Sequence, residues 1–140
     1  MAETCAGINL RRAARAVSNH YDQIFSAACG LRITQIPPLV ALYLGGPQAI
    51  SELAGRLDLD RTTLSRNLKI LEQAGLVSIE PGEDQRTRMV CLTQEGLKTL
   101  LKVLPVWEEA QRQFVAKLGE ERFRTLLVQL SEVADQSQEA

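Results

Sequence analysis

Apolar residues in the first third of the chain recur at steps of three and four positions, which is the period of an α-helix. The pattern predicts a first helix over about residues 8–29 that ends at Gly30, and a second helix over about residues 35–44. Pro37 and Pro38 fall in the first turn of the second helix, where proline is tolerated because the amide has no helical partner. The start of this helix is therefore expected slightly later than the apolar pattern alone indicates.

The middle third predicts two short helices joined by a tight turn. The first runs from Ile50 to about Leu57, and the second covers about residues 61–74. Asp60 is a good N-cap for the second helix because its carboxylate accepts amide hydrogens and suits the positive helix end. Gly75 is a natural residue to follow the last turn. Two helices joined in this way form a helix-turn-helix. The inner face of the second helix is expected to consist of Leu64, Leu68 and Leu71.

An alternation of apolar and polar residues follows directly. Val77 and Ile79 alternate with polar neighbours, and Val90 and Leu92 alternate again after a turn-rich segment. Residues 77–92 therefore predict a β-hairpin with a charged tip. Helix, turn, helix and hairpin in this order predict a winged helix-turn-helix.

The last third returns to helical periodicity. Thr93 is a candidate cap for a long helix that reaches about residue 118 and contains Pro105. A final helix is predicted after Gly119, and the polar residues 135–140 are expected to fray. The fold class is therefore mainly α with a small β-hairpin wing. The positions expected to face inward on the long helix are Leu97, Leu100, Leu101, Leu104, Trp107, Phe114 and Leu118, and the apolar positions that mark the final helix are Phe123, Leu126, Leu127, Leu130 and Val133.

The composition is that of a small globular protein rather than a disordered chain. Of 140 residues, 45% are hydrophobic and 24% are charged, with 16 Lys and Arg against 17 Asp and Glu. The net charge of −1 excludes coating of nucleic acid by overall charge, so any nucleic-acid site must be a local patch. No apolar run approaches the roughly 18 residues of a membrane helix, and the N-terminus lacks a signal-peptide core. We therefore expect a cytoplasmic protein without a membrane partner.

Catalytic and metal chemistry have little support in the sequence. One histidine and the widely spaced Cys5, Cys29 and Cys91 predict neither a disulfide framework nor a Cys/His zinc site. Paired-carboxylate, P-loop and nucleophile-elbow patterns are also missing from the sequence. We therefore expect no enzymatic activity, no metal and no cofactor. An inert thiol is the default interpretation of each cysteine, and thiol-based redox sensing is an alternative.

The exposed face of the predicted 61–74 helix carries the residue types that read DNA. Arginine pairs with guanine, asparagine or glutamine with adenine, and serine or threonine with phosphate or base. A solvated helix face is the alternative, but the position before a hairpin favours contact with the major groove. Helical spacing puts four residues in one stripe, and others flank it. The stripe is Thr62, Arg66, Lys69 and Gln73, and the flanking residues are Arg61, Thr63, Ser65 and Asn67.

The charged tip of the hairpin is the second candidate contact. Arg86 and Arg88 lie there, and an arginine on a protruding hairpin can enter a narrow minor groove, where negative potential is concentrated. Asp84 is placed to orient Arg86 through a charge-assisted hydrogen bond. An ordinary solvated turn is the alternative, which the neighbouring helix-turn-helix disfavours.

Two segments carry a family resemblance. LAGRLDLDRTTLSRNLKILEQAGLV (53–77), followed by EDQRTRMVCLTQEG (83–96), resembles the MarR family of bacterial transcription regulators. The wing of that family has D-R-R and then a strand that ends in L-T-x-x-G, and Gln85 replaces the first arginine here. The opening NLRRAARAV (9–17) and the terminal helices match less specifically, and Pro37-Pro38 departs from the family's usual second helix. The matching wing residues are Asp84, Arg86, Leu92, Thr93 and Gly96.

The resemblance implies an obligate homodimer whose N- and C-terminal helices intertwine. Each subunit would place one winged helix on half of a pseudo-palindromic operator in double-stranded DNA. We expect residues 1–30 and 97–140 to form the dimerisation region and residues 31–96 to form the DNA-binding domain. The long terminal helices support this independently, because they carry more apolar positions than so small a domain covers alone.

The resemblance also implies regulation, since many members are repressors released by small anionic ligands or by thiol oxidation. We expect a ligand-responsive repressor with a small-molecule effector. A winged-helix protein-interaction adaptor is the alternative that the net charge of −1 favours, because charge neutralisation supplies much of DNA affinity. In the family the effector lies between the DNA-reading lobe and the dimer helices. Candidate effector-binding residues of suitable type near there are Asn19, His20, Tyr21, Tyr43 and Trp107.

Overall fold

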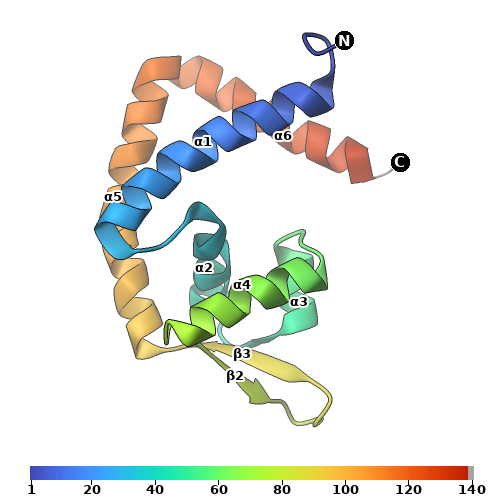
Figure 1. Ribbon diagram of the computed structural model, residues 1–140, viewed down its shortest axis with the longest axis vertical. Helices are drawn as coiled ribbons and strands as arrows, with labels where there is room; N and C mark the ends of the chain where they lie inside the picture. Colours follow the sequence, from blue (N-terminus) through green and yellow to red (C-terminus); the bar gives the residue numbers. More distant parts are fainter. Residues whose placement is uncertain (139–140) are drawn as a thin grey trace. The chain divides into compact units, whose positions relative to one another are not determined.

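The computed structural model describes residues 1–138, and the chain divides into two compact units, Met1–Val106 and Trp107–Ala140 (Figure 1). Six α-helices, one 3-10 turn and three strands follow one another along the described residues, and the fifth α-helix spans the boundary between the units. The elements are α1 (Ala6–Cys29), η1 (Ile33–Gln35, a 3-10 turn), α2 (Ile36–Gly45), β1 (Gln48–Ala49), α3 (Ile50–Arg56), α4 (Arg61–Gln73), β2 (Val77–Pro81), β3 (Arg88–Leu92), α5 (Gln94–Leu118) and α6 (Glu120–Gln138).

The first two helices begin and end where the sequence chemistry requires. Gly30 closes α1 in the left-handed conformation, with φ of 74°, and its amide donates to the Ser26 carbonyl oxygen over 3.1 Å. Helix α2 begins at Ile36, so the two prolines occupy its first turn as expected. The turn η1 directly before it was not predicted. It connects the end of α1 to the start of α2 (Figure 1).

The helix-turn-helix is formed by α3 and α4, and its hydrophobic core lies within the first unit. Leu64, Leu68 and Leu71 of α4 are fully buried, which confirms the predicted inner face. They share this core with Leu53 of α3 and Val90 of β3, both also fully buried. Complete burial of a leucine side chain contributes about 1.5–3 kcal/mol, so this face fixes α4 on the rest of the unit.

The predicted hairpin is part of a three-stranded antiparallel sheet with strand order β1-β3-β2. Val77 pairs with Leu92 and Ile79 with Val90, and Gln48 of β1 pairs with Val90 on its other side. Figure 1 shows the β2–β3 hairpin projecting from the body of the unit near α4. Strand β1 was missed because its two residues are too few to show alternation.

Several inward positions predicted on α5 are wrong for this single chain. Leu101 is 52% exposed, Leu104 is 42% exposed and Trp107 is 44% exposed, whereas Leu100 and Val103 are buried. Successive residues of a helix are rotated by about 100° about its axis. A face that buries Leu100 and Val103 therefore leaves the adjacent residues exposed to solvent. Leu127, Leu130 and Val133 mark the final helix as predicted, and in α6 they are 51%, 42% and 42% exposed.

The other predicted apolar positions of α5 and α6 are buried or partly buried. Phe114 and Phe123 meet edge to face within the second unit, with ring centroids 6.0 Å apart. Gly119 separates the two helices with φ of 91°. The expectation of fraying at 135–140 is wrong for 135–138, which continue α6, and residues 139–140 lie outside the described part.

No single helix among the described residues has the length and apolar composition to cross a bilayer. Helix α1 and the segment Ile33–Gly45 meet these criteria only together, and they are bent by 74°. Residues 1–138 contain no group of three or more His, Cys, Asp and Glu side chains placed to hold a metal ion.

Candidate nucleic-acid interface

Helix α4 begins at a side-chain cap. Thr63 donates its amide to Asp60 Oδ2 over 2.9 Å and its hydroxyl to Asp60 Oδ1 over 2.5 Å. The hydroxyl bond first, and the amide bond second, hold the pKa of Asp60 below its ordinary value, so the carboxylate is ionised at neutral pH. The negative charge at the N-terminus also favours the helix dipole. The hydroxyl of Thr63 is therefore engaged in the cap, although the sequence placed it among the DNA-contacting residues.

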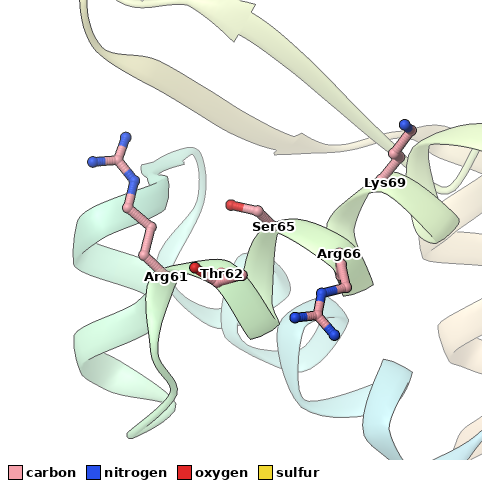
Figure 2. Close-up of a pocket in the computed structure, with 5 residues that line it drawn as sticks. All are labelled: Arg61, Thr62, Ser65, Arg66 and Lys69. Atoms are coloured by element: carbon pink, nitrogen blue, oxygen red, sulfur yellow. The ribbon is translucent and has the colours of Figure 1, made fainter.

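The exposed face of α4 carries an open hollow of about 470 Å³. Figure 2 shows that Arg61, Ser65 and Lys69 point to one side of the helix axis while Arg66 points to the other. The structure thus brings together five of the eight residues that the sequence placed on the exposed face of this helix. The lining residues are Arg61, Thr62, Ser65, Arg66 and Lys69.

The charge of this hollow is uniform. Three of its five residues are cationic and two carry hydroxyl groups, and the first carboxylate within α4 is Glu72. A chain with a net charge of −1 therefore concentrates positive charge on one helix. Such a surface can pair with phosphate oxygens, and its guanidinium and hydroxyl groups can hydrogen-bond base edges.

Asn67 does not share this surface, although the sequence placed it on the flank of the stripe. Its side chain is half-buried, and its Nδ2 donates to the carbonyl oxygen of Thr34 in η1 over 2.6 Å. Gln73 is exposed at the end of the helix and does not line the hollow. The predicted stripe is therefore shorter in the structure than the helical spacing alone indicates.

The wing differs in detail from the prediction. Asp84 Oδ1 accepts the backbone amide of Arg86 over 3.2 Å, so the carboxylate shapes the turn and does not hold the guanidinium. Thr87 donates its amide to the Asp84 carbonyl over 2.8 Å and closes the same turn. Arg86 lies on the tip, whereas Arg88 is the first residue of β3 and pairs with Pro81. Both arginines are exposed and remain available to a ligand.

The candidate effector residues of the first unit do not meet in one pocket. Tyr21 is buried and stacks on Phe25 with ring centroids 5.7 Å apart, and burial raises the pKa of Tyr21. His20 contacts the Tyr21 ring edgewise at 6.1 Å. The exposed Asn19 lines a hollow of about 410 Å³, together with Asp22, Gln23, Ser26 and Arg32.

Tyr43 lines a different hollow of about 270 Å³. Its side chain is 54% exposed, and the half-buried Cys91 lines the same hollow. Trp107 is 44% exposed and belongs to the second unit. The remaining wall of the Tyr43 hollow is formed by Leu42, Gly46, Pro47, Leu92, Thr93, Gln94 and Leu97.

The three cysteines are free and half-buried. Cys5 lies at the N-cap of α1 and makes no side-chain cap bond there. Cys29 donates its thiol to the Phe25 carbonyl oxygen over 3.2 Å, within the same helix.

Sequence reasoning missed two contacts near the interface. The amide of Ile33 donates to Asp22 Oδ1 over 2.7 Å, and Asn67 binds Thr34 as described above. One signal in the sequence points to the second contact. In a helical turn, the carbonyl of residue 34 would accept a hydrogen bond from the amide three or four residues later. Those residues are Pro37 and Pro38, and neither proline has an amide hydrogen.

Known proteins resemble this chain in sequence and in fold. Residues 41–80 match a family described as a helix-turn-helix domain. YwoH of Bacillus subtilis, an uncharacterized HTH-type transcriptional regulator, is 34% identical over 89 residues. That match covers 61% of this chain and 65% of YwoH, so the chain spans just under two thirds of this relative.

Solved structures match over almost the whole chain. The M. tuberculosis transcriptional regulator MosR, in complex with DNA, is 35% identical with a TM-score of 0.81, covering 95% of this chain and 98% of MosR. A MarR/EmrR family transcriptional regulator from Acinetobacter sp. ADP1 has a TM-score of 0.83 at 18% identity, covering 100% of this chain and 99% of that one. At 18% identity, the likeness to the Acinetobacter regulator shows a shared fold alone.

Proposed function

The chain belongs to the MarR family of winged helix-turn-helix transcriptional regulators, and we propose that it binds a pseudo-palindromic operator in double-stranded DNA as a homodimer. We propose that it represses transcription there, that a small molecule releases it, and that it catalyses no reaction. Since it acts on the chromosome, its place is the cytoplasm.

The observation that carries this proposal is the cationic hollow on α4. Arg61, Arg66 and Lys69 place three positive charges around one open hollow on α4, with Thr62 and Ser65 beside them as hydrogen-bonding groups. Phosphate contacts by such cations supply most of the affinity of a DNA-binding protein, while contacts to base edges supply specificity. The exposed Arg86 on the hairpin adds a cation on a second projecting element.

A homodimer would account for the apolar surface that one chain leaves uncovered. On α6, Leu127, Val128, Leu130 and Val133 are between 42% and 57% exposed. On α1, Ile8 and Leu10 are 44% and 39% exposed. Exposed apolar side chains that recur along whole helices favour association with another surface. We therefore propose residues 1–30 and 97–140 as the dimerisation region and residues 31–96 as the DNA-binding domain.

The effector is proposed from the family and from the polar hollow on α1. A hollow of about 410 Å³ falls in the range that small ligands occupy, and Arg32 supplies a cation for an anionic group. Asn19 is the one candidate effector residue that lines it. A ligand there would change DNA occupancy only by binding the DNA-free conformation more tightly than the DNA-bound one.

The test is the salt dependence of binding between the full chain and DNA from its own promoter region. A DNA-binding protein loses affinity as salt rises, with a slope of about −0.9 for each phosphate contact. We expect the variant Lys69→Ala to bind more weakly and with a slope reduced by about one contact. Arg112→Ala removes the same charge from an exposed position on α5 and serves as the matched control. An adaptor without DNA affinity would show no salt-sensitive binding in either protein.

A further inference from the structure

A long-range side-chain hydrogen bond joins helix α4 to the turn η1, in addition to the leucine face that packs in the core. Asn67 Nδ2 donates to the Thr34 carbonyl oxygen over 2.6 Å, across 33 residues of sequence. The residue is half-buried, whereas the five residues that line the α4 hollow are exposed. Its amide therefore faces the protein rather than a ligand.

The acceptor of this bond exists because of the two prolines. In a 3-10 turn or an α-helix, the Thr34 carbonyl would accept an amide from the third or fourth following residue. Those residues are Pro37 and Pro38, which have no amide hydrogen. The carbonyl thus lacks a local donor, and Asn67 supplies one from α4.

The same turn is fixed to α1 from its other side. The Ile33 amide donates to Asp22 Oδ1 over 2.7 Å. The turn is closed internally by Arg32 and Gln35, whose backbone and side chain exchange bonds of 2.8 Å and 3.0 Å. In this three-residue turn, Ile33 therefore makes a hydrogen bond to α1, and the next residue, Thr34, makes a hydrogen bond to α4.

We propose that Asn67 is a positioning residue for DNA recognition, that it reads no base, and that it acts together with Asp22 through η1. The two bonds form a connection from α1 to the DNA-facing helix, Asp22–Ile33 and Thr34–Asn67. This inference rests on the proposed function, because it assigns α4 the role of contacting DNA. It also assigns a role to Pro37-Pro38, which creates the vacant acceptor.

The test compares Asn67→Ala and Asp22→Ala with matched controls. We expect each variant to bind the operator about 3- to 10-fold more weakly, as the loss of one hydrogen bond implies. The preference for each operator base and the salt slope should stay unchanged. Asp22→Asn keeps an acceptor of equal length and should restore binding. Gln73→Ala changes an exposed residue of α4 that does not line the hollow, and it should bind as the parent does.

A double variant tests whether the two bonds act through one turn. The double variant combines Asp22→Ala and Asn67→Ala. It should lose clearly less operator affinity than the product of the two single fold-losses, because either change alone already releases η1. Losses that multiply independently would overturn the proposal. A changed base preference in Asn67→Ala would also overturn it, since that result would make Asn67 a base-reading residue.

Hydrogen exchange supplies a measurement that needs no DNA. In Asn67→Ala, the Ile33 amide should exchange several-fold faster, while the amides of Leu64 and Leu68 in the α4 core keep their rates. An unchanged Ile33 rate would overturn the connection. Failure of the parent protein to bind DNA would instead refute the proposed function, and the exchange rates would still decide whether Asn67 holds η1.

Discussion

Gly96 lies directly against the backbone of Leu76, at the junction between the helix-turn-helix and α5. A Cβ atom on Gly96 would overlap the Leu76 carbonyl oxygen and would lie 2.7 Å from Leu92 Cδ1. Thr93 joins the same junction: its hydroxyl donates to the Gly75 carbonyl over 2.6 Å and accepts the Gly96 amide over 3.0 Å. The L-T-x-x-G pattern of the sequence is therefore a packing requirement that fixes the hairpin to α4 and α5.

Gly96→Ala should consequently destabilise the protein. The Leu76 carbonyl group occupies the place of the missing Cβ and moves only with the chain, so we expect a loss of about 1–3 kcal/mol in the free energy of unfolding. Urea unfolding followed by circular dichroism measures it. Gly55→Ala is the matched control: a Cβ there meets nothing within 4 Å, and alanine in helix α3 should stabilise by about 0.5–1 kcal/mol. Equal stability of the two variants would contradict this account of the junction.

Sequence patterns predicted the elements whose causes are local. The Asp60 cap, the left-handed Gly75 and the leucine face of α4 each depend on residues a few positions apart. The partner of Asn67 lies 33 residues away, and helical spacing alone placed this residue on the outer face. Periodicity also identified apolar positions on α5 and α6, but it does not distinguish a face covered by the same chain from one left exposed.

The two projecting elements should contribute differently to DNA binding. Arg66 lies on the α4 hollow and Arg86 on the hairpin tip. We expect Arg66→Ala to change the base preference and to cost about 1–3 kcal/mol at one operator position, because a bidentate contact to guanine is lost. Arg86→Ala should weaken binding evenly across sequences. Competition binding with a randomised operator pool separates the two effects. Full affinity and an unchanged preference in Arg66→Ala would remove it from the DNA interface.

The exposed apolar face of α6 should be a dimer contact. Burial of one leucine side chain contributes about 1.5–3 kcal/mol to association. In a two-fold interface each leucine is buried in both subunits and contributes twice. Leu127→Glu with Leu130→Glu should therefore shift the full-length protein toward the monomer in sedimentation velocity and weaken operator binding. Gln136→Glu adds charge at an exposed position of α6 on the opposite side of the helix from Leu127 and should leave the dimer intact. A monomeric parent protein at micromolar concentration would contradict the proposed assembly.

The Asp60 cap should make part of the stability depend on pH. Its hydrogen bonds to Thr63 lower the pKa of Asp60 in the folded protein, so the cap stabilises α4 above the unfolded value of about 3.9. This contribution is lost as the pH falls through the lower folded value. Asp60→Asn keeps an acceptor that does not titrate. From pH 7 to pH 3, the thermal unfolding midpoint of the parent should therefore fall further than that of Asp60→Asn. Equal falls in the two proteins would show that the protonation of Asp60 is not coupled to folding.

The cysteines should be dispensable for regulation. Cys29 donates its thiol within α1, and Cys5 and Cys91 are half-buried free thiols on separate elements, the N-cap of α1 and strand β3. A sensing cysteine needs an environment that favours the thiolate, such as an adjacent cation. We therefore expect the triple variant Cys5→Ser, Cys29→Ser, Cys91→Ser to keep its operator affinity within about 2-fold, less than the loss of one hydrogen bond. It should also keep its normal induction in cells.

The measurements are operator binding and a promoter reporter, each with and without peroxide. If peroxide releases the parent from DNA while the triple variant stays bound and cannot be induced, the regulator is a thiol sensor and the small-molecule proposal is wrong.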